Sequence, residues 1–180
     1  MKVAPDPEHL TTTTDLVIRQ VEKADLPALE WDGEYLKYRL MYANLYRNTE
    51  SGKTLMWIIQ IPQGEIIGQV FVMLKSQEPG AADGRHRAYV FAFRVKPAWR
   101  NRGIGTRLMD YVEKDLRRRG YKFVTLNVAK QNPGARRLYK RLGYKVISSQ
   151  PGLWSFMDHT GQRHKVEEPA WRMIKRLDVH

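Results

Sequence analysis

The sequence has 180 residues and contains no cysteine. Disulfide bonds, thiolate metal sites and a cysteine nucleophile are therefore excluded. Long apolar runs are missing as well. No stretch approaches the roughly 18 apolar residues that a membrane span requires, and the N-terminus lacks a basic segment followed by an apolar one. We therefore expect a cytoplasmic protein without a membrane partner.

Acidic residues are scarce in the second part of the chain. Residues 1–80 carry 8 lysines and arginines against 11 aspartates and glutamates, whereas residues 81–180 carry 23 against 8. The basic part should attract an anion, such as nucleic acid, a membrane surface or a phosphorylated cofactor. A basic, soluble surface without a specific partner explains the charge equally well.

The length and the apolar content of 42% fit one globular domain with a full core. Residues 1–12 end in a threonine run and are expected to form a flexible tail, which leaves 13–180 for the domain. Hydrophobic periodicity and turn residues predict strands at 15–22, 53–61, 65–76, 88–95, 121–128, 144–149, 153–158 and 164–177. Helices are predicted at 24–31, 33–48, 103–119 and 132–143.

This order of elements predicts a mixed α/β fold. We expect a mostly antiparallel sheet of about seven strands, flanked by about four helices. The segment 88–128 is a strand–helix–strand unit, so the strands at 88–95 and 121–128 should be parallel. In the helix at 103–119, the apolar stripe that should face the sheet comprises Leu108, Met109, Val112 and Leu116.

The segment VKPAWRNRGIGTRL (95–108) places bare backbone and positive charge at one strand-to-helix junction. The first N–H groups of a helix lack partners and together carry about half a positive charge. Gly103 and Gly105 leave these groups accessible, and Arg100 and Arg102 add formal charge. We therefore expect a phosphate or pyrophosphate site, although a tight turn alone would also explain the glycines.

Other phosphate and metal motifs are absent. The P-loop pattern is missing, and the dinucleotide fingerprint needs a third glycine where Leu108 stands. His159 and His164 lie five residues apart around an expected turn, which fits incidental histidines better than metal ligands. We therefore expect no metal.

The junction resembles the acetyl-CoA motif of the GNAT superfamily of N-acyltransferases, Val-x-Pro followed by Arg/Gln-x-x-Gly-x-Gly/Ala. The matching residues are Val95, Pro97, Arg100, Gly103 and Gly105. The second motif of the family follows at the expected distance, with Asn132, Ala135, Tyr139, Gly143 and Tyr144. The ending WRMIKRL resembles the last strand of the family, so the resemblance covers about 88–177.

The resemblance implies the GNAT fold, a splayed parallel strand pair and acetyl-CoA as co-substrate. The residues that it implies for acetyl-CoA binding are Phe93, Val95, Arg100, Asn101, Arg102, Gly103, Ile104, Gly105, Thr106, Asn132 and Tyr139. The pyrophosphate would lie on the N–H groups of 102–106, and the pantetheine amides would pair with the main chain of Val95. The backbone near Phe93 would donate to the thioester carbonyl. Helix capping alone would also explain Asn132.

The implied reaction moves an acetyl group from the thioester to a primary amine. Because no cysteine can carry the acyl group, direct attack in a ternary complex is favoured. The resemblance makes Tyr139 the general acid for the departing thiolate, although its helix spacing also fits a core tyrosine. In the family, a glutamate on the strand before the pyrophosphate loop often serves as the general base. Because 88–95 contains no glutamate, the base stays open here. The alternatives are His86, Glu34, Glu30 and a water relay.

The acceptor amine is not identified by the sequence, and it could belong to a small molecule or to a protein or peptide. Acidic residues at 30–34 precede Tyr35, Tyr38, Tyr42 and Tyr46, which share one helix face, and this combination suits a cationic amine. Packing of the tyrosines on the sheet is the favoured explanation of that face.

Two other functions stay open, namely an acyl-CoA sensor without turnover and a basic nucleic-acid-binding module. The basic segments 114–122 and 135–141 suggest the second, but arginines at helix ends also complement the helix dipole, so nucleic acid is not favoured. Dimers are common in the family, which leaves a homodimer as an alternative to a monomer.

Overall fold

The computed structural model describes residues 15–178, so the tail expected at 1–12 lies outside the described residues. The helices are the 3-10 helices η3 (Lys23–Glu30), η4 (Leu36–Tyr38) and η5 (Pro97–Trp99), and α1 (Arg39–Glu50), α2 (Ile104–Arg118) and α3 (Pro133–Arg141). The strands are β1 (Val17–Gln20), β2 (Thr54–Gln60), β3 (Ile66–Met73), β4 (Arg87–Val95), β5 (Phe123–Ala129), β6 (Lys145–Gln150), β7 (Leu153–Met157), β8 (Arg163–Glu167) and β9 (Ala170–Arg176).

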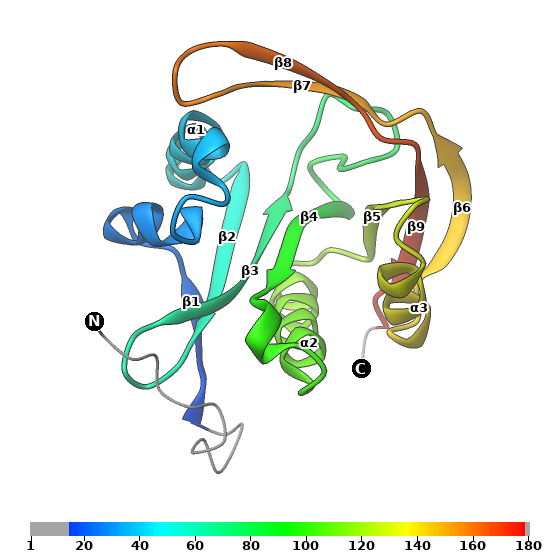
Figure 1. Ribbon diagram of the computed structural model, residues 1–180. Helices are drawn as coiled ribbons and strands as arrows, with labels where there is room; N and C mark the ends of the chain where they lie inside the picture. Colours follow the sequence, from blue (N-terminus) through cyan, green and yellow to red (C-terminus); the bar gives the residue numbers. More distant parts are fainter. Residues whose placement is uncertain (1–14, 179–180) are drawn as a thin grey trace.

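Seven strands form one sheet in the order β1-β2-β3-β4-β5-β9-β6, and β7 and β8 form a separate hairpin (Figure 1). The pair β4–β5 is parallel, and all the other pairs of this sheet are antiparallel. The predicted mixed, mostly antiparallel sheet and its parallel pair are confirmed. Within residues 15–178, no helix is both long enough and apolar enough to cross a membrane.

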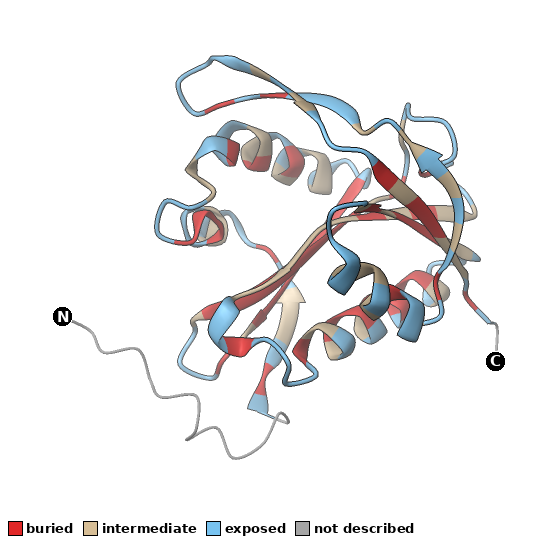
Figure 2. Cartoon of the chain, turned by 45° about the vertical axis from the view of Figure 1, so that its right-hand side comes forward, coloured by how far each residue is buried: buried red, intermediate tan, exposed pale blue. Residues whose placement is uncertain are grey.

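Helices cover both faces of the sheet, and the buried residues gather between the layers (Figure 2). On one face, the predicted stripe of α2 is fully buried, with no exposed surface on Leu108, Met109, Val112 or Leu116. Burying each such side chain stabilises the fold by about 1.5–3 kcal/mol. On the other face, α1 and η3 contribute Tyr42, Leu45 and Leu29 to a second core.

Two predicted elements differ from the structure. The α-helix expected at 33–48 begins only at Arg39. Gly33 has a positive φ of 102°, which a right-handed helix does not contain, and the ψ angles of Tyr35 (20°) and Tyr38 (6°) on either end of η4 depart from α-helical values. The strand expected at 164–177 is divided at Pro169 into β8 and β9. A proline has no N–H for a central ladder, so the chain leaves the hairpin there before it enters the main sheet.

A bulge in β4 prepares the site. Phe91 pairs with Phe71 and Arg94 pairs with Gln69, so two residues of β4 lie opposite one residue of β3. The extra residue changes which side chains share a face. Ala92 in the bulge has a φ of 50°, and its carbonyl accepts a hydrogen bond from Gln69 Nε2 at 3.2 Å.

The bulge explains the direction of the side chains along β4. Ala88 and Val90 before it, and Phe93 and Val95 after it, join the core under α2. Arg94 therefore lies with Phe91 on the α1 face of the sheet, where it contacts tyrosines. Without the extra residue, the alternation of a strand would place Arg94 on the opposite face.

Candidate active site

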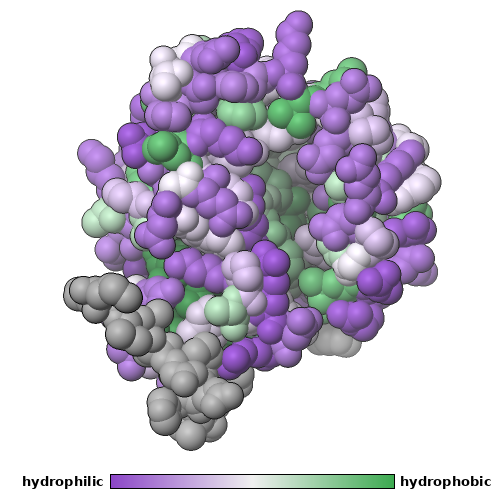
Figure 3. Space-filling view, viewed as in Figure 1, coloured by the Kyte–Doolittle hydropathy of each residue, from purple (hydrophilic) through white to green (hydrophobic). Residues whose placement is uncertain are grey.

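A central cleft of about 950 Å³ opens where β4 and β5 diverge. The two strands pair only from Arg87↔Phe123 to Val90↔Leu126, although both continue beyond these residues. The splayed parallel pair is therefore present. Figure 3 shows the hollow on the same side of the molecule, with apolar side chains inside it. The size and the mixed lining are typical of a ligand site.

The central cleft gathers most of the residues predicted to bind acetyl-CoA. Those that line it are Phe93, Val95, Arg100, Asn101, Gly103, Ile104, Gly105, Thr106, Asn132 and Tyr139. Arg102 is not among the lining residues, and its guanidinium lies 5.7 Å from the ring centroid of Trp99.

The N-terminus of α2 supplies free backbone donors to the cleft. The first bond back along the chain runs from Arg107 N to the Gly103 carbonyl at 3.0 Å. The N–H groups of Ile104, Gly105 and Thr106, here called the amide cradle, have no backbone acceptor within the described residues. These donors and the positive end of the helix dipole favour an anion at this place.

Glycine is favoured at both positions of the motif, for different reasons. Gly103 has a φ of 76°, where other residues are strained, and a Cβ there would meet nothing within 4 Å. At Gly105 a Cβ would lie only 2.9 Å from Phe93 Cζ. Gly105 thus lets the ring of Phe93 approach α2 closely, while Gly103 leaves open space in front of the cradle.

Arg100 is fixed beside the amide cradle, because its Nε donates to the Val95 carbonyl at 2.9 Å. Arg137 and Arg141 reach the same cleft from α3. Asn132 also lines it, and its Oδ1 caps α3 by accepting from Ala135 N at 3.0 Å. The cleft therefore has a strongly basic wall on the side of α2 and α3.

Tyr139 combines a core ring with a place in the cleft wall. Its ring centroid lies 6.2 Å from that of Phe93 and 5.9 Å from that of Tyr144. The hydroxyl has no hydrogen bond to any residue in 15–178. Burial, and to a smaller extent Tyr89, raises the pKa of Tyr139 far above its usual value. The phenol is therefore protonated at neutral pH, as a proton donor must be.

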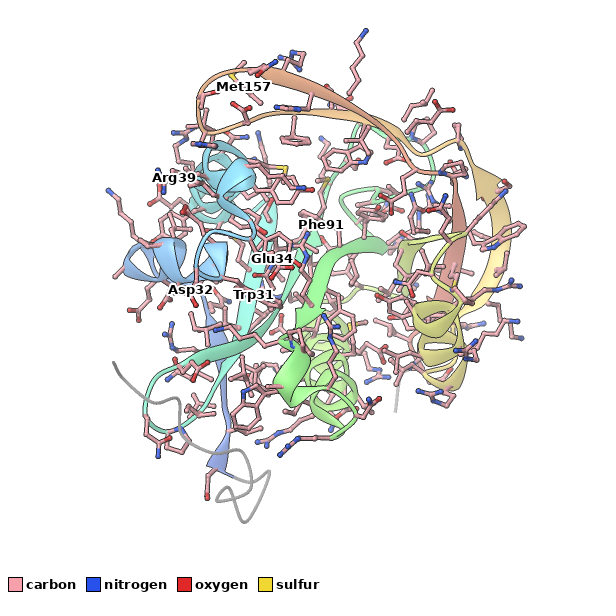
Figure 4. The ribbon with its side chains drawn as sticks, viewed as in Figure 1. Trp31, Asp32, Glu34, Arg39, Phe91 and Met157 are labelled. Atoms are coloured by element: carbon pink, nitrogen blue, oxygen red, sulfur yellow. The ribbon has the colours of Figure 1, made fainter. Side chains whose placement is uncertain are left out.

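The predicted bases lie outside the lining of the cleft. His86 is at the closed end of β4, where its carbonyl accepts from Lys122 N at 2.8 Å and from Phe123 N at 3.0 Å. Glu34 lies on the loop before α1, and this part of the loop faces β4 and Phe91 (Figure 4). Glu30 is held by Arg39 through two bonds of 2.8 and 2.9 Å, which lower the pKa of Glu30.

Glu168, which the sequence analysis missed, is the one carboxylate in the cleft lining among the described residues. It lies directly before Pro169, between β8 and β9, and its N–H donates to the Gly152 carbonyl at 3.0 Å. Pro169 could have indicated that the strand ends just before it, because a proline is rarely found inside a central strand. A continuous strand over 164–177, as the sequence predicts, gives no reason to place this side chain in the cleft.

Arg94 is the second residue that the sequence analysis missed. Its guanidinium lies 4.1 Å from the ring centroid of Tyr35, and its Nη1 donates to Tyr42 Oη at 2.8 Å. Tyr38 and Tyr42 are buried, so the favoured packing role of the tyrosine face is confirmed for them. Arg94 and Tyr35 also line the central cleft, at the end that faces α1 and is here called the acceptor end.

No cluster of three or more His, Asp or Glu side chains in the described part of the chain is placed to hold a metal ion. A second pocket, of about 290 Å³, lies between η3 and the turn after β2 and includes Glu30. Because that carboxylate is already bound to Arg39, the central cleft is the better candidate for chemistry.

Residues 18–144 match the acetyltransferase (GNAT) family, and the chain belongs to this family. The matched region contains both motifs, the diverging strands and the amide cradle. The expected family is thereby confirmed.

Solved structures of acetyltransferases share the fold. The ribosomal-protein-S18-alanine N-acetyltransferase from Escherichia coli superposes with a TM-score of 0.67 and 19% identity, covering 92% of this chain and 96% of its own. The yncA protein from Salmonella typhimurium, solved with its cofactor acetyl-CoA, gives 0.68 and 19%, with 92% and 95% covered. The spermidine/spermine N-acetyltransferase SpeG from Vibrio cholerae gives 0.68 and 15%, with 91% and 94% covered.

Proposed function

We propose that the protein is an N-acetyltransferase that moves an acetyl group from acetyl-CoA to a primary amine by direct attack. The observation that carries this proposal is the continuity of the central cleft. It joins a set of free N–H groups at the start of α2, the buried tyrosine of α3, and a carboxylate at the acceptor end. Membership of the GNAT family and the yncA structure with acetyl-CoA support the same cofactor.

The amide cradle is the proposed site of the cofactor diphosphate. Its N–H groups donate to phosphate oxygens, while Arg100, Arg137 and Arg141 balance the negative charge. Beyond Val90, β4 pairs with β3 on one edge only, so its other edge offers backbone groups to the gap. An extended ligand with amide groups would add to this edge like a strand.

Acetyl-CoA supplies a thioester whose carbonyl carbon the amine attacks. The β4 backbone at Phe93 is the proposed donor to the carbonyl oxygen, where negative charge develops. Tyr139 is the proposed general acid, which gives its proton to the sulfur as the carbon–sulfur bond breaks and the carbon–nitrogen bond forms. The bulge at Ala92 explains why β4 turns its backbone and Phe93 toward the cleft at this point.

The acceptor must lose a proton before it attacks, because a primary amine with a pKa near 10 is mostly protonated at neutral pH. Glu168 is the proposed recipient, directly or through a water molecule. It replaces the bases expected from the sequence, since neither His86 nor Glu34 lines the cleft. In this scheme Glu168 also attracts the ammonium form of the acceptor and thereby positions it.

Several of the basic residues that suggested nucleic acid are engaged within the protein, and Arg137 and Arg141 line the central cleft. On α2, Lys114 pairs with Asp110 at 2.8 Å, and Arg119, directly after the helix, pairs with Asp115 at 2.6 Å. On α3, Arg136 lies 5.3 Å from the ring centroid of Trp171. These contacts favour an intramolecular role for the two segments.

A thiol-release assay with acetyl-CoA and a panel of amines tests the proposal, with the acetylated product identified by mass spectrometry. We expect one equivalent of free thiol for each acetylated amine. Acetyl-CoA binding without thiol release against every amine would instead support the acyl-CoA sensor. Retention on nucleic acid that weakens with salt, without acetyl-CoA binding, would support the nucleic-acid module.

A further inference from the structure

Arg94 carries a positive charge that no carboxylate in residues 15–178 neutralises. One hydrogen bond, to Tyr42 Oη at 2.8 Å, engages its guanidinium, which has five N–H donors. A half-buried charge without a counter-ion is unfavourable. An anionic group of a ligand in the cleft would satisfy the remaining donors.

Aromatic rings hold this guanidinium in place. It lies 4.1 Å from the ring centroid of Tyr35 and 5.7 Å from that of Tyr38. Stacking on rings is a common way to orient an arginine for a planar, bidentate partner such as a carboxylate. Because the rings fix the geometry beforehand, little side-chain entropy is lost when a ligand binds.

Glu168 provides the opposite charge in the same cleft, and the two residues form no ion pair with each other. Both lie close to Tyr38. Burial raises the pKa of Tyr38 most, Arg94 lowers it, and Glu168 raises it. The acceptor end thus presents a separate cation and anion. A molecule that carries both an ammonium and a carboxylate group fits this pair of charges.

A polyamine fits this end of the cleft poorly. The acidic stretch expected to attract a cationic amine does not supply its carboxylates there, since Glu30 is bound to Arg39 and neither Asp32 nor Glu34 lines the cleft. A chain with several ammonium groups would meet the charge of Arg94. The structural likeness to SpeG therefore concerns the fold.

We propose that Arg94 is a specificity residue that selects a small amine carrying a carboxylate near its amino group, as in an amino acid. The inference rests on the proposed function. The carboxylate of the acceptor binds the guanidinium of Arg94, and its ammonium group faces Glu168 before it loses a proton. Arg94 does not take part in the chemical step.

Matched acceptors test this proposal in the thiol-release assay. Each amino acid is paired with its carboxamide, for example glycine with glycinamide and β-alanine with β-alaninamide, and spermidine and C-terminally amidated peptides complete the panel. A carboxamide lowers the basicity of a nearby amine and so leaves more of it unprotonated. The same lower basicity makes this amine a weaker nucleophile, so the two effects largely offset each other. A preference for the acid of tenfold or more must therefore come from binding. We expect kcat/KM to be roughly 10- to 100-fold higher for the acid of the best pair.

Arg94→Gln should bring the ratio of kcat/KM for the acid to kcat/KM for the carboxamide down to about one, mainly through a higher KM for the acid. Arg94→Lys should keep part of the preference, because it retains the charge but not the bidentate geometry. A loss of folded protein changes both members of a pair equally, so the ratio of acid to carboxamide separates recognition from stability.

Two results would overturn the proposal. One is equal or better use of carboxamides, spermidine or amidated peptides by the unchanged protein. The other is an equal effect of Arg94→Gln on both members of a pair. If no amine with a carboxylate is acetylated while acetyl-CoA still raises the thermal midpoint, the acceptor proposal fails and the cofactor site stands. If acetyl-CoA does not bind at all, the proposed function itself fails.

Discussion

Tyr139 and Tyr144 are neighbouring buried tyrosines that offer a direct test of the chemistry. Removing the hydroxyl of Tyr139 should lower activity but not stability, and removing that of Tyr144 should lower stability but not activity. Their ring centroids lie 5.9 Å apart, and both belong to the core under α2. Tyr139 lines the central cleft, and its hydroxyl has no partner in the described part of the chain. The hydroxyl of Tyr144 instead donates to Glu113 Oε1 at 2.9 Å.

Tyr139→Phe should reduce acyl transfer by roughly 10- to 1000-fold, because the departing thiolate loses its proton donor. Stability should hardly change, since the lost hydroxyl made no hydrogen bond. The affinity for acetyl-CoA should stay nearly the same, because the ring remains against Phe93. Single-turnover thiol release and isothermal titration calorimetry measure these two quantities separately.

Tyr144→Phe should have the reverse effect. Removing a hydrogen bond to a buried carboxylate costs about 1.5–3 kcal/mol, even though Lys175 Nζ still holds Glu113 Oε2 at 2.7 Å. For a protein of this size, about 2–4 °C is lost per kcal/mol, so the thermal midpoint should fall by roughly 3–12 °C. Turnover per folded molecule should be unchanged. Full activity of Tyr139→Phe, or a greater loss of stability in Tyr139→Phe than in Tyr144→Phe, would refute the reasoning.

Two further predictions concern carboxylates. Glu168→Gln should lower kcat/KM, measured by thiol release, by at least tenfold at neutral pH, and the acid limb of the pH–rate profile should become weaker. The affinity for acetyl-CoA should be unchanged. An unaltered pH–rate profile would show that Glu168 does not accept the proton. The second carboxylate is Asp83, in the loop before β4. Burial raises the pKa of Asp83, but hydrogen bonds from the N–H groups of Arg87, Arg85 and His86 outweigh this effect and lower the pKa to about 2. An Asp with a lowered pKa stabilises the fold above its ordinary pKa of 3.8, and this contribution is lost as the pH falls toward 2. Thermal midpoints measured from pH 6 to pH 2 should drop mainly below pH 4.5, and less steeply for Asp83→Asn; identical slopes would contradict this role of Asp83.

The side of the cleft that is proposed to bind the cofactor could be predicted from the sequence, since its determinants are local. A proline, two glycines and a periodic apolar stripe define the turn and α2, and Asn132 with Pro133 defines the start of α3. The parallel pair followed from the strand–helix–strand order. The first motif follows β4 and the second follows β5, so the parallel pairing of these two strands brings both motifs to the same end of the sheet.

The acceptor side could not be predicted, because it depends on long-range features. An alanine rarely has a positive φ, so nothing in the sequence marked the bulge at Ala92 that directs Arg94 toward the tyrosines. The hydrogen bond from Gln69 that supports the bulge joins residues 23 positions apart. Glu168 reaches the cleft only because the chain passes from the β7–β8 hairpin to the main sheet at Pro169. Likewise, the sequence does not show that Glu30 is held by Arg39, nine residues away.

The central claim, that the N-terminus of α2 binds the diphosphate of acetyl-CoA, is tested most directly by calorimetric titration of three proteins. These are the unchanged protein, Gly105→Ala and Gly105→Glu. The alanine variant adds a Cβ 2.9 Å from Phe93 Cζ and controls for the loss of glycine at this position. The glutamate variant adds a carboxylate that should repel phosphate, although a negative charge in the first turn favours the helix itself. We predict clear binding by the unchanged protein, weaker binding by Gly105→Ala and no measurable heat with Gly105→Glu, whereas equal affinity of all three proteins would contradict the account.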